Sequence, residues 1–473
     1  MQVEYKIERF FVAACILLFP MIGSISRGPG FLGGLGKEGS FYPAAIFMMV
    51  FILGLWLEKR NLYFPNMRYA RYLCCFLIVA LFSLVFNLSD LLPLTFKGQS
   101  GLSRAAMQYG SLCVYVLMAI CFFNFFRRSR DSGEFLSKWV IYSAFFSALY
   151  SIFEMGALLG DDTCRSIRAS FDELFRSNAE SHIGFDYALR LRSLADEASF
   201  FALYSGIVLP WIMMGILSHK GRKQLILVGL FIVYLIMNIF SFSRTGYVIL
   251  AFEVMAFLFL MRKEIAFRRF FSSIGMILIA LASIFASMPS NSEVIEKIDV
   301  VSIFQSIFVE DDVHELSNVA RYGTQEACLQ IFKEHPLFGV GYGEFGFYAS
   351  DNYPNAAWKS GEIRAWASNV VPGPWPPAHS LYARLLAETG VCGVIPWLLF
   401  WGILIIQLYR RMRISPNREE RYQILSLIVS FLGIVCFGFG NDSMRTIAQW
   451  CFLGFAWNIL SKNSRMEVSN RQK

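Results

Sequence analysis

The sequence predicts an all-α integral membrane protein with about twelve transmembrane helices. Of its 473 residues, 56% are hydrophobic and only 16% are charged, whereas a soluble domain has roughly 25% charged residues. Long apolar runs recur along the chain, and each can cross a hydrocarbon core about 30 Å thick. The expected spans lie at residues 8–25, 41–57, 69–88, 108–126, 137–159, 198–217, 224–241, 246–261, 271–288, 391–409, 422–439 and 444–461.

The distribution of basic residues predicts the orientation of these helices. Alternate connections, beginning with residues 58–71, contain 20 Lys and Arg residues. The four short connections on the other side contain six, namely Arg27, Lys37, Lys97, Arg104, Arg244 and Arg445. Short cytoplasmic loops retain basic residues, so we expect the basic connections and both termini on the cytoplasmic side. The net charge of +8 therefore reflects topology and does not indicate nucleic-acid binding.

The chain is expected to form a single polytopic membrane domain over residues 1–473, with two long outward loops. These loops are residues 160–197 and residues 289–390, and the second is expected to contain helices. Function is expected there, because the inward loops are short and merely basic. Cys164 and Cys328 lie one in each loop. They form a disulfide under one hypothesis, which requires an oxidising exterior, and stay free under the other.

The SFSRTG stretch, residues 241–246, places an arginine in the outward turn between the seventh and eighth expected spans. Under one interpretation Arg244 is a snorkelling side chain at the membrane interface. Under the other it binds an anion at headgroup level, since a guanidinium offers a planar fork for phosphate oxygens. Ser243 and Thr245 would add hydroxyl groups, and Gly246 would let a bulky ligand approach the backbone.

A second outward segment, RLRSLADEASFFALY, precedes the sixth expected span and contains Arg190 and Arg192. Ser193 and Asp196 have the spacing of a capping box, which gives Asp196 a structural role. Glu197 is expected in the first turn of the span, where an acid is costly unless it is used. The alternative for Glu197 is a favourable charge at the positive end of the helix dipole.

The large loop contains LSNVARYGTQEACLQIFKEHPLFGVGYGEFGFY, which predicts a helix that ends at His335-Pro336. Arg321 lies on the flank of its apolar face. The GVGYGEF run lacks the strand–turn–helix setting of a nucleotide-binding motif, so we expect its glycines to form a tight turn against neighbouring backbone. The apolar face follows helical spacing and comprises Leu316, Val319, Ala320, Ala327, Cys328 and Ile331.

The loop ends with PPAHSLYARLLAETGVCG, where His379 begins an amphipathic helix that leads into the tenth span at Gly390. Glu388 follows nine residues after the histidine. A histidine in this position is either structural or able to take a proton from an attacking hydroxyl near neutral pH. Trp358, Trp366 and Trp375 precede it and either pack the loop or stack on sugar rings.

The sequence predicts no metal site, because the five histidines are scattered and none pairs with a cysteine in a metal-ligand pattern. No Gly-x-Ser-x-Gly motif occurs either. A reaction at the outer face would then use guanidinium groups to stabilise the charge of a leaving group. Pyrophosphate is already an activated leaving group, so arginines at headgroup level with a nearby base indicate a polyprenyl-pyrophosphate substrate.

From its fifth expected span onward, the sequence resembles the O-antigen ligase/polymerase superfamily of bacterial membrane glycosyltransferases. The resemblance rests on SFSRTG at 241–246, on the segment from Arg321 to Phe345, and on HSLYARLLAETGVCG from His379 to Gly393. RLRSLADEASFFA is similar to a segment of exopolysaccharide polymerases. The resemblance implies a GT-C-like fold and a metal-independent, inverting transfer, without a cofactor, at the periplasmic face of the inner membrane.

The resemblance also implies roles for individual residues. Arg192, Arg244 and Arg321 would hold the donor pyrophosphate, His379 would be the catalytic base, and Glu197 would be the second catalytic candidate. The chain departs from the family pattern in having Ser380 where asparagine is common after the histidine. Arg190 also competes with Arg192 for one role, and the sequence leaves that choice open.

Three functions fit these residues. An O-antigen polymerase would move a growing chain from undecaprenyl pyrophosphate onto a lipid-linked repeat unit, with a chain-length regulator protein as a candidate partner. An O-antigen ligase would move the finished chain onto lipid A–core. A lipid-linked oligosaccharide flippase would need polar residues through several spans, and here polar residues gather at the outer face. The two long outward loops, both with arginines, and the exopolysaccharide-like segment that contains Glu197 favour the polymerase over the ligase.

Overall fold

The computed structural model describes residues 2–25, 28–29, 32–175, 190–262, 312–371 and 373–471, and this part of the chain is almost entirely helical. A short hairpin, β1 (Thr95–Phe96) and β2 (Gln99–Ser100), is the one sheet among the described residues. Eight described helices are long and apolar enough to cross a membrane. They are α3 (Met67–Phe86), α5 (Gly101–Arg128), α6 (Ser132–Leu158), α8 (Ala198–Ser218), α9 (Arg222–Phe240), α10 (Arg244–Met261), α17 (Leu381–Ile414) and α18 (Arg418–Phe437).

The helices α1 (Gln2–Leu17), α2 (Phe41–Leu57) and α19 (Ile447–Arg471) occupy three further expected spans. The first helix begins and ends earlier than expected, and α2 is apolar but shorter than the other eight. The expected span at 271–288 lies outside the described residues. The prediction of a multi-pass helical membrane protein is therefore confirmed, and the total of twelve spans stays a prediction.

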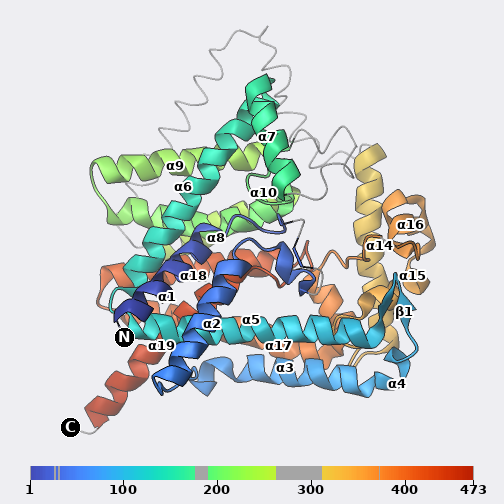
Figure 1. The fold of residues 1–473 in the computed structure, drawn as a ribbon, viewed down its shortest axis with the longest axis horizontal. Helices are drawn as coiled ribbons and strands as arrows, with labels where there is room; N and C mark the ends of the chain where they lie inside the picture. Colours follow the sequence, from blue (N-terminus) through green and yellow to red (C-terminus); the bar gives the residue numbers. More distant parts are fainter. Residues whose placement is uncertain are drawn as a thin grey trace.

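Both chain termini lie at one end of the helical bundle, and α14 (Asp312–Glu334), α15 (Phe345–Asn352) and α16 (Gly361–Ala367) lie at the opposite end (Figure 1). We call these the terminus end and the loop end. At the terminus end, Glu8 pairs with Arg60 and Arg128, and Arg9 lies 2.8 Å from Asp131. Two of the basic connections thus lie beside α1, as the alternation of basic residues predicts.

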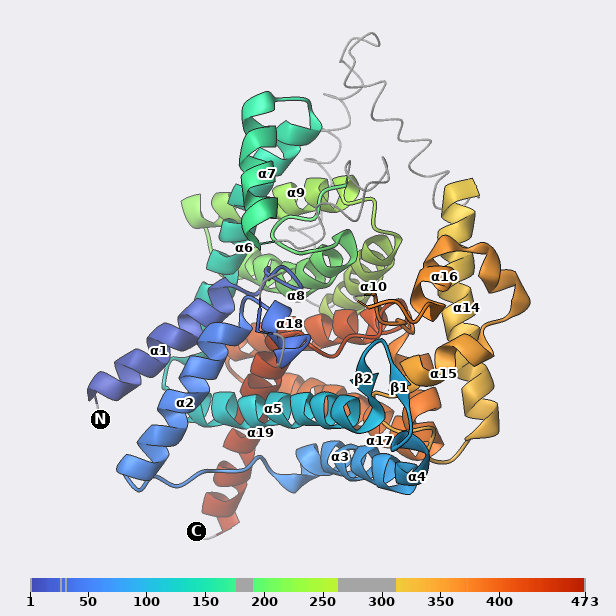
Figure 2. The ribbon, with the colours of Figure 1, turned by 45° about the vertical axis from the view of Figure 1, so that its right-hand side comes forward.

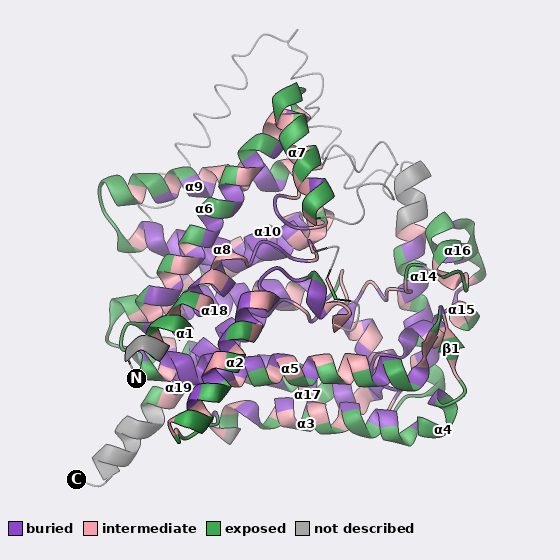
Figure 3. Cartoon of the chain, viewed as in Figure 1, coloured by how far each residue is buried: buried purple, intermediate pink, exposed green. Residues whose placement is uncertain are grey.

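The bundle is held together by close packing around α8, which is buried over most of its length (Figure 3). Helix α18 packs along α8, α19 along α5, and α17 along α3. At Gly454 of α19, a Cβ atom would lie 2.7 Å from the Ala119 carbonyl oxygen. Small residues at such crossings let helix backbones approach closely, which favours association in a membrane.

The helices at the loop end lie against one another (Figure 2), and their buried side chains form a second, smaller core. As the spacing predicts, α14 buries Ala320, Ala327, Cys328 and Ile331. It ends at Glu334, directly before His335-Pro336, because the residue before a proline is disfavoured in a helix. All ten cysteines are free, including Cys164. The hypothesis of a Cys164–Cys328 disulfide is therefore wrong for this structure, since Cys328 is enclosed in the α14 core.

The GVGYG turn packs across a kink in α17. Gly390 adopts φ 60° and ψ −165°, which interrupts the helix where the sequence places the start of the tenth span. The amide of Val340 donates to Ala387 O at 3.0 Å, and Cβ atoms added at Gly339 or Gly390 would overlap the opposite backbone. The predicted tight turn is thus confirmed, and it fixes two of the family-like segments against each other.

Candidate active site at the loop end

Three of the family-like segments each contain a non-glycine residue in the left-handed backbone region. These residues are Ser193, Phe242 and His379, with φ values of 52°, 46° and 51°. Residues with a side chain rarely adopt this conformation, and the local strain of roughly 1–3 kcal/mol per residue tends to occur at functional sites. Three of the five such residues in the described part of the chain therefore lie in segments that the sequence singles out, and Lys59 and Lys97 are the other two.

Arg244 is the first residue of α10, and it reaches α14. The Ser243 side chain caps α10 by accepting a hydrogen bond from Gly246 N at 3.2 Å, which fixes where the helix starts. The guanidinium of Arg244 is half-buried and donates to Asn318 Oδ1 of α14 at 3.0 Å. The arginine is thus held at the loop end by a specific contact.

Arg321 lies on α14, and His379 contacts the same helix. Asn318 and Arg321 are three residues apart, so they share one side of the helix. One turn further on, Gln325 Nε2 donates to the His379 carbonyl oxygen at 3.1 Å. Arg321 is exposed and acts electrostatically on the His379 ring. Helix α14 therefore brings together three of the five residues that the sequence predicts for the site: Arg244, Arg321 and His379.

The His379 ring lies in an environment that keeps it neutral. Burial, and then the positive charge of Arg321, lower the pKa of His379 to about 4, against the opposite effect of Asp442. Its Nε2 atom is buried and has no hydrogen-bond partner among the described residues. The Trp366 ring lies 5.3 Å away between centroids. A neutral imidazole with an open nitrogen can accept a proton from an acceptor hydroxyl.

Asp442 is a residue of this site that sequence reasoning missed. It lies in the connection between α18 and α19, and its Oδ2 atom accepts from Ala378 N at 2.9 Å. Burial alone would raise the pKa of Asp442, but the charge of Arg384 and the Ala378 hydrogen bond outweigh it and lower the pKa. An ionised aspartate therefore fixes the backbone before His379. The sequence feature that could have indicated Asp442 is its position as an acidic residue in a very short outward connection.

The structure places Arg192 and Glu197 on other elements of the bundle. Arg192 Nη2 lies 3.0 Å from Asp172 Oδ2 of α7 (Asp162–Phe175), in the first long loop. Glu197 is the exposed N-cap residue of α8 and accepts from Ser199 Oγ at 3.1 Å. Arg190 lies within electrostatic range of Tyr247, one turn into α10. Arg190 is thus the arginine of this pair that the structure places beside the Arg244 helix.

The predicted capping box at Ser193 and Asp196 is wrong. Helix α8 begins at Ala198, not at Ser193. The Ser193 hydroxyl contacts Ser147 Oγ at 2.8 Å, and the Glu154 carboxylate accepts from the amides of both Arg192 and Ser193. A buried carboxylate from α6 thus satisfies the amides that the local motif would have paired, and it holds Ser193 in its strained conformation.

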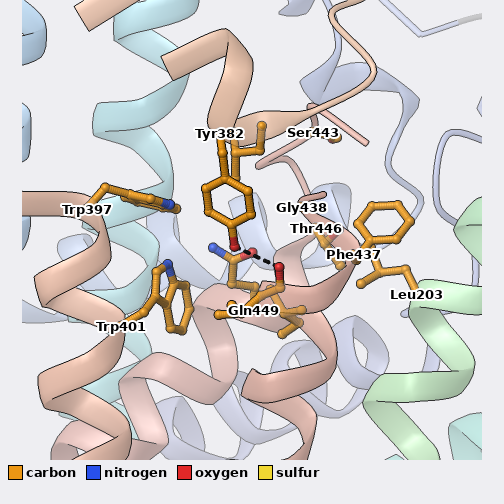
Figure 4. Close-up of a pocket in the computed structure, with 12 residues that line it drawn as sticks. Leu203, Tyr382, Trp397, Trp401, Phe437, Gly438, Ser443, Thr446 and Gln449 are labelled. Atoms are coloured by element: carbon orange, nitrogen blue, oxygen red, sulfur yellow. Dashed lines mark hydrogen bonds between the residues drawn. The ribbon is translucent and has the colours of Figure 1, made fainter. Parts of the chain in front are cut away.

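A small pocket lies between α8, α17, α18 and the start of α19 (Figure 4), and its lining on α17 begins at Leu381, two residues after His379. Its walls include Trp397, Trp401 and Phe437, with Gln449 among the polar groups. The Tyr382 hydroxyl donates to Val435 O at 2.7 Å. The pocket thus combines aromatic walls with polar groups, close in sequence to the candidate base.

Glu344 is a fully buried acid beside this site, at the end of the GVGYG turn. Burial, and then the charge of Glu388, raise the pKa of Glu344 to about 8 from its ordinary value of 4.5, although Arg104 and Arg384 oppose the rise. Neither carboxyl oxygen has a hydrogen-bond partner among the described residues. The folded protein therefore holds this proton to about pH 8, whereas an unfolded chain releases it near pH 4.5.

Glu344→Gln is expected to remove a pH-dependent loss of stability. The folded state binds the extra proton, so stability falls as the pH rises from about 4.5 to 8, by at most about 5 kcal/mol. Thermal unfolding of wild type and variant at pH 5 and pH 9 checks this. The variant should gain on the wild type at pH 9 and show little difference at pH 5. An equal difference at both pH values would contradict the assigned protonation.

The long apolar helices and the buried core define a multi-pass helical membrane protein. Residues 229–398 match the model of a protein family described as O-antigen ligase. This match places the region, which contains Arg244, Arg321 and His379, in the O-antigen ligase/polymerase superfamily, whose members are glycosyltransferase-like enzymes. No curated protein matches the chain. No group of three or more metal-ligating side chains occurs among the described residues.

Proposed function

We propose that this protein is an O-antigen polymerase of the bacterial inner membrane, with its site facing the periplasm. It transfers a glycan chain from undecaprenyl pyrophosphate onto a lipid-linked repeat unit, without a metal and with inversion at the anomeric carbon. The proposal rests on one observation. Arg244, Arg321 and His379 lie together around α14, within the region that matches the family model.

In the proposed reaction, His379 Nε2 takes the proton of the acceptor hydroxyl. The hydroxyl oxygen then forms a bond to the anomeric carbon of the donor, and the bond from that carbon to the pyrophosphate oxygen breaks. Undecaprenyl pyrophosphate leaves with the electron pair, and the guanidinium groups of Arg244 and Arg321 stabilise its charge. The negative charge of a bound pyrophosphate also offsets the positive charge of Arg321. The pKa of His379 then rises, which makes the imidazole a stronger base.

Arg192 and Glu197 keep the roles that the resemblance implies, as part of the proposal. Arg192 is the third donor contact, with Arg190 as its competitor, because Arg190 lies near the start of α10. Glu197 is the second catalytic candidate, since it stands at the start of α8 and is exposed.

The alternative is an O-antigen ligase, which would use the same donor chemistry and transfer the chain to lipid A–core. The two long loops, both with arginines, favour the polymerase because it handles two lipid-linked glycans at once. A non-enzymatic flippase is the third candidate. It does not account for the open nitrogen of His379 beside a positive charge.

The product pattern tests the proposed function. The protein is purified in detergent and incubated with its undecaprenyl-pyrophosphate repeat unit, without metal and without lipid A–core, and the products are resolved on a gel. A polymerase gives a ladder of longer lipid-linked chains. Transfer that occurs only after lipid A–core is added would show a ligase, and no transfer in either mixture would contradict the enzymatic proposal.

A further inference from the structure

A second cluster of arginines includes Arg384, which contacts Asp442, the residue that fixes the backbone before His379. Arg384 of α17 donates to the Asp442 carbonyl oxygen at 3.2 Å and to Glu388 Oε1 at 3.0 Å. Arg104 of α5 lies within electrostatic range of both Arg384 and Arg445. Arg445 belongs to the connection between α18 and α19. Three guanidinium groups from three elements therefore gather at the loop end, with Arg104 buried and the other two half-buried.

A small cavity, open on one side, lies beside this cluster between α5, α17 and the α18–α19 connection. Its polar lining comprises Gln108, Ser111, Tyr342, Arg384 and Arg445. The hydroxyl of Tyr115, which also lines it, is buried and has no hydrogen-bond partner among the described residues. Several groups that can donate hydrogen bonds thus face one space, which suits an anion with many acceptor oxygens.

Of the three arginines, Arg445 has the positive charge that its surroundings neutralise least. Its guanidinium forms no hydrogen bond with any described residue, and it lies directly against the backbone of Gly34. Glu38 is its nearby acid, and burial raises the pKa of Glu38 to about 8 despite the opposing charge of Arg445. With Glu38 and Glu344 protonated at neutral pH, Asp442 and Glu388 are left to balance three arginines. The cluster then has a positive excess.

We propose that this cavity is a second anion site, which binds the phosphate group of the acceptor lipid. The inference rests on the proposed function, because a polymerase must hold two lipid-linked glycans and the Arg244–Arg321 site accounts for one pyrophosphate. Asp442 connects the two sites: its carboxylate fixes the residue before His379, and its carbonyl oxygen receives Arg384. Asp442 thus connects the site of the acceptor carrier to the backbone that holds the candidate base.

The number of bound prenyl pyrophosphates tests this site directly. Native mass spectrometry of the full-length protein in detergent, with farnesyl pyrophosphate as the probe, is expected to show two molecules bound to the wild type. Arg445→Gln and Arg244→Gln should each retain one, and His335→Ala, a change at an exposed residue, should retain two. Two molecules bound to a folded Arg445→Gln variant would overturn the second site.

If Arg445→Gln does not fold, Gly34→Ala is the second variant that tests the Arg445 site. Gly34 has φ −68°, so alanine is compatible with its backbone, but the new Cβ atom would overlap the Arg445 guanidinium and displace its flexible end. We expect this variant to bind one farnesyl pyrophosphate, and retention of two would overturn the proposal. Inorganic pyrophosphate is tested in parallel. If it displaces farnesyl pyrophosphate from the Arg445 site at equal concentration, the site takes free pyrophosphate and the acceptor-lipid assignment is wrong.

The outcomes separate this inference from the proposed function. A wild type that binds two farnesyl pyrophosphate molecules but makes no ladder contradicts the polymerase and leaves the second site standing. A wild type that makes a ladder while Arg445→Gln still binds two molecules contradicts the second site and leaves the polymerase standing.

Discussion

His379→Ala is expected to abolish chain transfer while leaving membrane insertion and folding intact. The variant removes the neutral imidazole that takes the proton of the acceptor hydroxyl in the proposed reaction, and general base catalysis typically contributes about 10²–10⁴-fold to a rate. We therefore expect a fall of at least about 100-fold in the initial rate of ladder formation. The purified variant is compared with wild type at equal protein concentration, after its thermal unfolding has been shown to be normal.

His335→Ala is the matched control for this experiment. His335 follows the end of α14, is exposed and lies outside the site. Its variant should transfer chains at the wild-type rate. If His379→Ala, correctly folded, were as active as His335→Ala, the histidine would be structural and the base would have to be sought elsewhere, with Glu197 as the next candidate.

Gly390→Ala is expected to destabilise the protein more than any other single change discussed here. Its φ of +60° disfavours an L side chain by roughly 1–2 kcal/mol. The added Cβ atom would also lie 2.6 Å from the Pro336 carbonyl oxygen and overlap the backbone of Leu337. Backbone cannot give way like a side chain, so the turn against α17 must separate. We expect loss of folded protein, or a fall in Tm of many degrees.

Gly402→Ala in the same helix is the control. An added Cβ atom there meets nothing within 4 Å, and alanine favours a helix by about 1 kcal/mol over glycine. This variant should be as stable as wild type or more stable. A Gly390→Ala protein with the Tm of Gly402→Ala would show that the kink is not needed to join the two segments.

Features that depend on one segment of chain could be predicted from the sequence. Hydrophobic runs gave eight of the spans, because burial in a membrane is decided by local composition. The buried face of α14 followed from its 3.6-residue period, and its end followed from His335-Pro336. Gly390 was predicted as the start of the tenth span, and the kink lies at this glycine, which can adopt a positive φ without a steric penalty.

Features that depend on two distant segments could not be predicted. Asp442 contacts Ala378 across 64 positions, and Arg244 contacts Asn318 across 74. No local pattern encodes such pairs. The capping box at Ser193 failed for the same reason, since Glu154 of α6 binds the amides that the motif would have used. Sequence reasoning therefore found arginines and a histidine of the site but not the contacts that position them.

The most direct test of the central claim is the rate at which Arg244→Ala consumes the lipid-linked donor in the presence of a chelator. The claim is that arginines held around α14, rather than a metal, stabilise the leaving pyrophosphate. Wild type should keep its full rate with the chelator, and Arg244→Ala should lose about 10²–10³-fold, as when one stabilising donor is removed from a transition state. A folded Arg244→Ala with the wild-type rate, or a wild type that needs added metal, would contradict the account.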